Sequence, residues 1–253
     1  MLDLLKVLLC MPFLIYACYT DIKCRRVSNQ VWVVMLGVFS PIIIYEIITY
    51  GLSYIMWIAI SFILIFIFVY ILFYVGAFGG ADAKALMALA IIFPLYPALM
   101  IGSYTFPLEG IPPISLFTLT LFGNSVLLTV IVPIGLFFYN LTRPQLSETI
   151  KKPQYMFIGY RCDIDNLENL KHVRLLETVE EVDEIVKTKY SRGGGTIDED
   201  SIKSIRKYAT KGQIGNKIWV TPGLPFIIPI TAGFLSAIFY GDLIFKIAFL
   251  LMN

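Results

Sequence analysis

Six long apolar runs constrain this chain more than any other feature of its sequence. A bilayer core of about 30 Å needs a helix of about 20 apolar residues. Six stretches meet that requirement: residues 4–20, 31–49, 54–75, 83–101, 117–140 and 225–251. With 58% hydrophobic and 15% charged residues, the chain also lacks the polar surface of a soluble domain of 253 residues. The runs therefore predict an all-α membrane bundle of six transmembrane helices.

The charged residues are concentrated in one segment between the fifth and sixth runs. Of the 20 Lys and Arg residues 14, and of the 18 Asp and Glu residues 12, lie between Arg143 and Lys217. This predicts a membrane domain of helices 1–5 over residues 1–140, a small cytosolic α/β insert over 141–218, and a sixth transmembrane helix over 219–253. Because basic and acidic residues alternate in the insert, nucleic acid is not an expected partner.

The insert shows patterns of both strands and helices. Residues 154–160 and 172–175 are expected to form short strands. A helix beginning near Thr178 would place Val179, Val182, Ile185 and Val186 on one face. The three glycines at 193–195 indicate a mobile loop rather than a phosphate site, because no GK[ST] follows them. A second helix is expected over residues 198–211, with Ile202, Ile205 and Tyr208 facing inward.

The positions of the basic residues predict the orientation in the membrane. If the N-terminus lies outside, 18 of the 20 Lys and Arg residues fall on one side, which the positive-inside rule assigns to the cytosol. Only Lys6 and Lys246 disagree. We therefore expect a multi-pass protein of the cell membrane, surrounded by lipid, with the insert at the cytosolic face.

Metal and cofactor sites are not indicated. The chain has four cysteines without a CxxC pair, and His172 is its only histidine. Structural and catalytic zinc sites require more closely spaced Cys and His ligands than this. The prediction is a protein with no metal and no cofactor.

Two aspartates stand out among the few acids outside the insert. There are six such acids: Asp3, Asp21, Glu46, Asp82, Glu109 and Asp242. The predicted topology puts Asp21 at the inner end of the first span and Asp82 at the inner start of the fourth. Ionisable groups in membrane helices are costly and therefore mark functional sites by default. We expect Asp21 and Asp82 to meet inside the bundle.

The sequence around Asp82 favours the approach of an extended substrate. Asp82 lies in the motif Gly79-Gly80-Ala81-Asp82-Ala83-Lys84, and residues 76–81 are too glycine-rich for a comfortable helix. Irregular backbone at membrane depth is tolerated where it lines an enclosed or watery cavity. Asp21 and Asp82 are each followed two residues later by a lysine, Lys23 and Lys84, which would tune the carboxylates or anchor the inner face.

Paired carboxyl groups permit one specific chemistry. Two such groups a few Å apart share a proton, because both cannot ionise cheaply. One can then take a proton from water while the other donates to a carbonyl, which hydrolyses a peptide without a metal. The alternative at this point is that both aspartates only cap helices and pair with nearby Lys and Arg residues.

These motifs resemble those of the GxGD membrane aspartyl proteases. Asp21 after the first span, and the 79–84 motif opening the fourth, are most similar to the archaeal preflagellin peptidases, relatives of the type IV prepilin peptidases. Six spans with an insert before the last, and the ending 221–226, also resemble that family. Ala81 departs from the glycine of the family name. The two CxxC motifs of many bacterial prepilin peptidases are absent, which argues against a methyltransferase activity.

The resemblance implies an aspartic endopeptidase with Asp21 and Asp82 as catalytic residues. Its partner would be a preflagellin, with a basic leader and a hydrophobic helix, cut at the cytosolic membrane face. Gly79, Gly80, Ala81, Lys84 and Lys23 would line the approach of the substrate. Two alternatives stay open: a peptidase of related prepilin-like precursors, and a proton- or cation-coupled transporter that uses the two aspartates.

Overall fold

The computed structural model describes residues 2–76, 78–143, 146–182 and 185–252. The chain divides into two compact units. The first, here called the membrane unit, consists of Met1–Thr129 and Pro225–Asn253, and the second, the insert unit, of Val130–Leu224. The domain boundaries predicted at 140 and 218 stay predictions.

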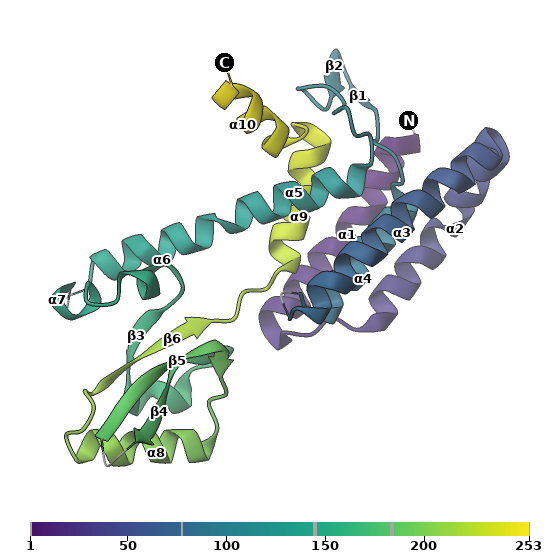
Figure 1. Cartoon of the computed structure of the whole chain (residues 1–253). Coiled ribbons are helices and arrows are strands. Elements are labelled where there is room, and N and C mark those ends of the chain that lie inside the picture. Colours follow the sequence, from purple (N-terminus) through teal and green to yellow (C-terminus); the bar gives the residue numbers. More distant parts are fainter. Residues whose placement is uncertain (1, 77, 144–145, 183–184, 253) are drawn as a thin grey trace. The chain divides into compact units, whose positions relative to one another are not determined.

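Three long apolar helices begin the membrane unit. Helix α1 covers Leu2–Cys24, α2 covers Asn29–Tyr50 and α3 covers Leu52–Tyr74, and each is long and apolar enough to cross a membrane. Figure 1 shows them running side by side. Ser28 caps α2 by accepting a hydrogen bond from the backbone amide of Gln30. Many large apolar side chains on these helices are exposed, as expected for surfaces that contact lipid.

The fourth apolar run does not form one helix. Helix α4 covers only Gly80–Ile92, and the prediction of a span over 83–101 is therefore wrong. Pro94 and Pro97 follow, and the helix ends just before the first of them because the residue preceding a proline avoids the helical conformation. Two short antiparallel strands come next, β1 over Leu99–Ile101 and β2 over Tyr104–Phe106.

The last two runs form helices that are divided or bent. Residues 117–141 contain α5, Phe117–Thr129, and α6, Ile131–Leu141, which together are long enough for one span. Helices α9, Ile227–Phe239, and α10, Leu243–Met252, are bent by 66° at the break between them. Over the described residues, the chain thus has four candidate spans, or five if the bent pair counts as one. The prediction of six spans is not supported.

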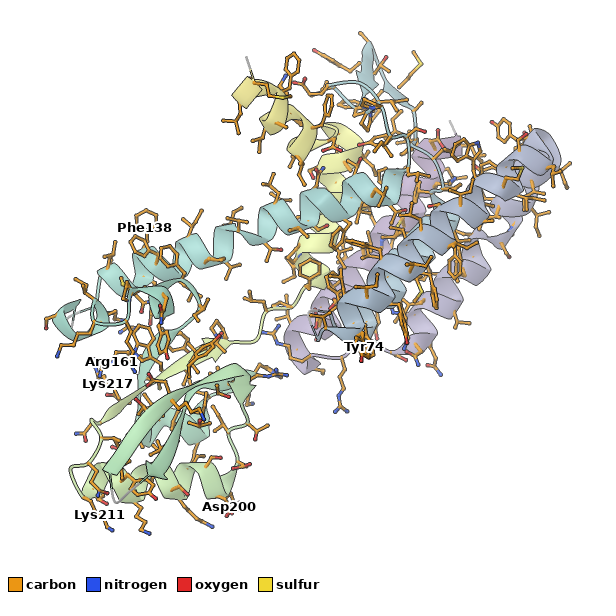
Figure 2. All side chains as sticks on the ribbon, in the orientation of Figure 1. Tyr74, Phe138, Arg161, Asp200, Lys211 and Lys217 are labelled. Atoms are coloured by element: carbon orange, nitrogen blue, oxygen red, sulfur yellow. The ribbon has the colours of Figure 1, made fainter. Side chains whose placement is uncertain are left out.

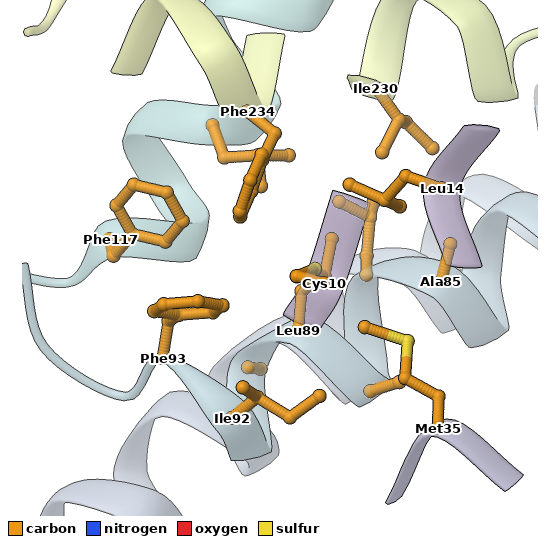
Figure 3. Packing of buried hydrophobic residues seen from close by; sticks show 14 of the residues in the cluster. Cys10, Leu14, Met35, Ala85, Leu89, Ile92, Phe93, Phe117, Ile230 and Phe234 are labelled. Atoms are coloured by element: carbon orange, nitrogen blue, oxygen red, sulfur yellow. The ribbon is translucent and has the colours of Figure 1, made fainter. Parts of the chain in front are cut away.

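One apolar core holds the membrane unit together. It contains side chains from α1, α2, α4, α5 and α9, of which Figure 3 labels ten. The rings of Phe93, Phe117 and Phe234 pack against one another with centroids 5.4–5.6 Å apart. Helix α4 is buried on most of its surface, since Ala85, Leu86, Ala88 and Leu89 are all enclosed. A helix that is apolar all round belongs inside a bundle.

The insert unit combines α6 with short helices and one sheet. The helices after α6 are α7 (Leu146–Thr149), the 3-10 helices η1 (Pro153–Phe157) and η2 (Ile164–Asn169), and α8 (Glu199–Thr210). The strands are β3 (Tyr160–Asp163), β4 (Val173–Val182), β5 (Ile185–Gly195) and β6 (Lys217–Pro222). The sheet order is β3-β6-β4-β5, and all its neighbouring strands are antiparallel. A small sheet in the C-terminal part of the chain is thus confirmed.

Several expectations for the insert need correction. The helix expected from Thr178 is wrong: Thr178 and Val179 lie in β4, which pairs with β5 as a hairpin, and residues 183–184 lie outside the described residues. The β-branched residues of this segment favour a strand. Glycines 193–195 belong to β5 rather than to a loop. The strand expected at 154–160 is the 3-10 helix η1, followed by β3 from Tyr160.

The sheet of the insert unit is covered on both faces. On one face, Leu175 and Val220 pack with Ile202 and Ile205 of α8, as the predicted helix over 198–211 required. On the other, Trp219 packs with Tyr155 of η1. Figure 2 shows the charged side chains of Asp200 and Lys211 at opposite ends of α8. Asp198 caps that helix by accepting a hydrogen bond from the Ser201 amide. Hydrogen bonds from the Ser201 side chain and from this amide lower the pKa of Asp198.

Candidate active site

Asp21 lies in the last turn of α1, on the face that the bundle buries. The side chains of Cys10, Leu14, Ala17 and Asp21 recur at helical spacing and are all buried. Only 8% of the surface of Asp21 is exposed in the folded chain. Its position therefore follows from the same periodicity that builds the apolar core.

Asp82 lies in the first turn of α4 and is held there by the backbone. Its Oδ2 accepts a hydrogen bond of 3.1 Å from the amide of Gly79, the residue that caps the helix. A Cβ on Gly79 would lie 2.9 Å from this same Oδ2, so a larger residue at position 79 would require the carboxylate to shift. The irregular backbone is shorter than predicted, because α4 already begins at Gly80. Ala77 lies outside the described residues.

The structure brings Asp21 and Asp82 together within the membrane unit. The two carboxylates interact electrostatically, and the amide of Ile227 donates a hydrogen bond to Asp21. Ile227 is the first residue of α9, whose N-terminus favours negative charge. The candidate site therefore lies where the end of α1, the start of α4 and the start of α9 meet.

Thr231 and Ile227 of α9 are neighbours of this site that the sequence did not indicate. The Sγ of Cys18, one turn before Asp21, lies 3.1 Å from the Oγ1 of Thr231 and 3.7 Å from the carbonyl of Ile227. These contacts join α1 to α9 next to the aspartates. A sequence signal was present in residues 221–226, which precede α9, but it gave no pairing between these helices.

The two motif lysines make contacts of their own. Lys84 donates a hydrogen bond of 2.7 Å to the Oδ1 of Asn29 and so joins α4 to the start of α2. Lys23 is exposed, donates to the hydroxyl of Tyr19 and lies over the ring of that residue. The partners of both lysines therefore support the anchoring interpretation more than a contact with the aspartates. Gly80 has open space around its Cα, and Ala81 packs against the core.

A second charged cluster explains why Lys6 disagreed with the predicted orientation. Lys6 forms a buried ion pair with Glu46 at 2.9 Å, and Tyr54 donates a hydrogen bond of 2.6 Å to the same carboxylate. The charge of Lys6 is thus compensated inside the bundle, and its position says nothing about the side of the membrane. Since every partner in this cluster is satisfied, we interpret it as structural.

Cys162 of the insert unit is not suited to nucleophilic catalysis. It lies on β3, half-buried, and its burial together with the charge of Asp163 raises the pKa of the thiol. A nucleophilic cysteine requires a lowered pKa instead.

Known proteins match nearly the whole chain. Residues 8–134 match the type IV leader peptidase family, and residues 151–243 match the family described as archaeal peptidase A24 C-terminus type II. The preflagellin peptidase of Methanococcus voltae is 30% identical over 92% of this chain and 94% of its own length. The chain belongs to the type IV leader peptidase family. Its first matched segment, residues 8–134, contains both Asp21 and Asp82.

Two further relatives carry the same name. The preflagellin peptidases of Methanocaldococcus jannaschii and Methanococcus maripaludis are 26% and 29% identical to this peptidase. The alignments cover 92% and 90% of this chain, and 93% and 92% of the relatives. The prediction of a protease is confirmed by the family. The catalytic role of the two aspartates stays a prediction, supported by their proximity.

Proposed function

We propose that this peptidase removes the leader peptide of preflagellin, with Asp21 and Asp82 as its catalytic pair. The relatives named preflagellin peptidase, aligned over nearly their whole length, support the substrate. The observation that carries the catalytic assignment is the electrostatic interaction of two carboxylates sixty residues apart in the sequence, the buried Asp21 of α1 and the half-buried Asp82 of α4. A buried like-charged pair is costly to keep unless its chemistry is used.

The chemistry needs no group other than the two carboxyls and water. One carboxylate takes a proton from a water molecule while the water oxygen bonds to the carbonyl carbon of the substrate. The other carboxyl group gives its proton to the carbonyl oxygen, which forms a tetrahedral diol. The bond from carbon to nitrogen then breaks as the nitrogen takes a proton from the first carboxyl group, while the second, now a carboxylate, takes a proton from one hydroxyl of the diol and so returns to its starting state.

In this proposal, cleavage takes place at the cytosolic face of the cell membrane. The 18 of 20 Lys and Arg residues on one predicted side support this orientation. The short irregular stretch that ends at Gly79, with Gly80 and Ala81 next to it in the first turn of α4, would give an extended substrate room to pass. Lys23 and Lys84 would border this approach.

Cleavage of a precursor by variant peptidases tests the proposal. Membranes containing the wild-type peptidase are incubated with a preflagellin, and the new N-terminus is sequenced. Asp21→Asn and Asp82→Asn should each reduce cleavage by at least about 10³-fold, because each removes one partner of the proton exchange.

Asp242→Asn is the matched control for both substitutions. Asp242 accepts a hydrogen bond from the Phe245 amide at Oδ1 and one from the Thr120 hydroxyl at Oδ2. An asparagine can keep the first bond through its oxygen, and its amide group can donate to the Thr120 hydroxyl oxygen instead. This variant should cleave like the wild type. Normal processing by either dyad variant contradicts the catalytic assignment, and a wild-type peptidase that leaves preflagellin intact but cuts a prepilin contradicts the substrate.

A further inference from the structure

The insert unit contains a pocket that the proposed peptide cleavage does not use. Its volume is about 320 Å³, at the lower end of the range for small-ligand sites. The residues that line it come from the segment before η1, from strands β3, β4, β5 and β6, and from the loop before β6. All of them belong to the insert unit, whereas Asp21 and Asp82 belong to the membrane unit. We call this site the basic pocket.

Positive charge predominates in the basic pocket. Four of its lining side chains are cations: Lys151, Lys152, Arg161 and Lys217. Glu177 is the only acid among the described residues that line it, and this buried carboxylate forms an ion pair with Lys152. Lys217 lies 3.7 Å from Asp163, a loose pair in which both side chains stay partly exposed. The pocket therefore keeps an excess of positive charge, which predicts an anionic ligand.

The sheet of the insert unit holds these cations in place. Strands β3 and β6 are antiparallel neighbours in which Arg161 pairs with Trp219. Since Lys217 precedes Trp219 by two residues, these three side chains share one face of the sheet. Figure 2 shows Arg161 and Lys217 close together. Glu177 of the neighbouring strand β4 holds Lys152. A phosphate group in the pocket can therefore accept charge-assisted hydrogen bonds from donors on separate elements.

The segments that supply the pocket are fixed to the end of an apolar helix. Helix α6 belongs to the insert unit and also to a candidate membrane span. The rings of Phe137 in α6 and Phe157 in η1 stack with centroids 4.7 Å apart. Asn140 of α6 donates a hydrogen bond of 2.7 Å to the carbonyl of Gly159, two residues before Arg161. If α6 lies in the bilayer, these contacts put the basic pocket near the surface of the bilayer.

Exposed apolar side chains flank Lys151 and Lys152. Ile150 directly precedes the two lysines and is 54% exposed, and Phe157 at the end of η1 is 43% exposed. Phe138 on α6, labelled in Figure 2, is 60% exposed. Lysines next to exposed aromatic and aliphatic side chains are typical of protein surfaces at the membrane interface. A ligand dissolved in water would not require these apolar neighbours, so they favour a ligand that is part of the membrane.

We propose that the basic pocket binds the phosphate group of an anionic phospholipid headgroup. The cations supply charge and donors for the phosphate oxygens, and the apolar side chains beside Lys151 and Lys152 contact the lipid around it. A soluble phosphate ester has the same chemistry but no use for the apolar surface. The basic leader of preflagellin has the wrong charge for this pocket. Lipid binding here holds the insert unit at the membrane surface and does not depend on the proposed peptidase function.

Native mass spectrometry of the full chain in detergent measures this binding. The anionic lipid dioctanoyl phosphatidylglycerol should bind at least about tenfold more tightly than the zwitterionic dioctanoyl phosphatidylcholine. Lys151→Gln combined with Lys217→Gln should raise the Kd for the anionic lipid at least about tenfold, because both cations near the phosphate are lost. Lys151→Gln alone, at an exposed position, should raise it at least about threefold.

A second double variant is the matched control. Lys203→Gln combined with Lys207→Gln removes the same charge from exposed positions of α8, which covers the opposite face of the sheet from Trp219. This variant should bind the anionic lipid like the wild type. Soluble glycerol phosphate and inorganic phosphate, added in place of the lipid, should bind at least about tenfold more weakly than the anionic lipid, because they lack the apolar contacts.

Three outcomes would overturn the proposal. Equal affinities for the two lipids would exclude an anionic headgroup, and so would unchanged binding by the variants of Lys151 and Lys217. An equal loss of affinity in the α8 control would show that surface charge in general attracts the lipid. A soluble phosphate that binds as tightly as the anionic lipid would overturn the lipid as the source. Because no cleavage is measured, failure of the proposed function and failure of this inference are distinguishable.

Discussion

The position of the Asp82 carboxylate depends on the glycine three residues before it, Gly79. The Gly79 amide donates to the Asp82 carboxylate, and any Cβ at position 79 would lie 2.9 Å from the accepting oxygen. The close approach of the Asp82 carboxylate therefore explains why this position is a glycine. A positive φ does not explain it, since Gly79 has a φ of −82°. A larger residue at position 79 would displace the carboxylate from the position in which the Gly79 amide holds it.

Substitution of Gly79 should therefore impair the site more than substitution of its neighbour. Gly79→Ala should lower kcat for preflagellin cleavage about 10- to 100-fold, because the Asp82 carboxylate must move away from the added methyl group. Gly80→Ala adds a methyl group in open space and should stay at least about tenfold more active than Gly79→Ala. Equal activities in single-turnover assays of the two variants would contradict this account of Gly79.

Glu46 should control stability rather than catalysis. Glu46→Gln leaves the buried Lys6 ammonium without a full opposite charge and should destabilise the fold by about 3–5 kcal/mol. We expect a clearly lower melting temperature in detergent. Lys6→Met combined with Glu46→Gln removes both charges and should recover much of that loss. A double variant no more stable than Glu46→Gln would show that the ion pair is not what Glu46 contributes.

Single residues illustrate what a sequence can and cannot indicate about a site. Asp21 and Asp82 were predictable because carboxylates are rare in apolar spans and their expected depth agreed. The contact of the Ile227 amide with Asp21 was not predictable. A backbone amide acquires significance only when the acceptors around it are known, and these come from distant parts of the chain.

Helices α5 and α9 cross at a close distance in the membrane unit. A Cβ on Gly233 of α9 would lie 2.2 Å from the Ser125 Oγ and 2.7 Å from the Leu121 carbonyl of α5. Small residues at such positions let helix backbones approach closely in membranes. Asn124 adds hydrogen bonds from α5 to Ser236 and to the carbonyl of Gly241, as expected for a polar residue between membrane helices.

Enlarging Gly233 should separate these two helices. Gly233→Ala should cost about 1–3 kcal/mol of stability, because the methyl group meets backbone that cannot move without shifting α5. It should also lower activity, since α9 carries the Ile227 amide. Gly37→Ala in α2 places its methyl group in open space and serves as the control. Thermal unfolding in detergent should therefore distinguish the two variants, and similar melting temperatures would contradict the tight crossing.

The elements of the insert were less predictable than the spans. A run of about 20 apolar residues has few alternatives to a membrane helix, because only internal hydrogen bonds are available in lipid. The segment from Thr178 fits a helix by spacing, yet its β-branched residues pair with β5 in the sheet. Short segments of this kind are decided by their neighbours, so pattern alone gave the wrong element.

The orientation of the whole molecule in the membrane can be tested by cysteine labelling. In a chain whose native cysteines are replaced by alanine, Ser103→Cys and Ser204→Cys add one exposed thiol each. With an impermeant maleimide on intact cells, Ser103→Cys should be labelled and Ser204→Cys should not. Both should react after permeabilisation. The reverse pattern would contradict a cytosolic insert and with it the proposed face of cleavage.

The sequence by itself determined that the chain has helices apolar enough for a membrane, which segment carries most of its charge and which two aspartates are the candidate pair, because hydrophobicity and charge are properties of the residues themselves. The tertiary structure decided the rest. It ends α4 after 13 residues, bends α9 against α10, and places the Ile227 amide beside Asp21. These features depend on packing and on hydrogen-bond partners far apart in the chain, which no local pattern contains.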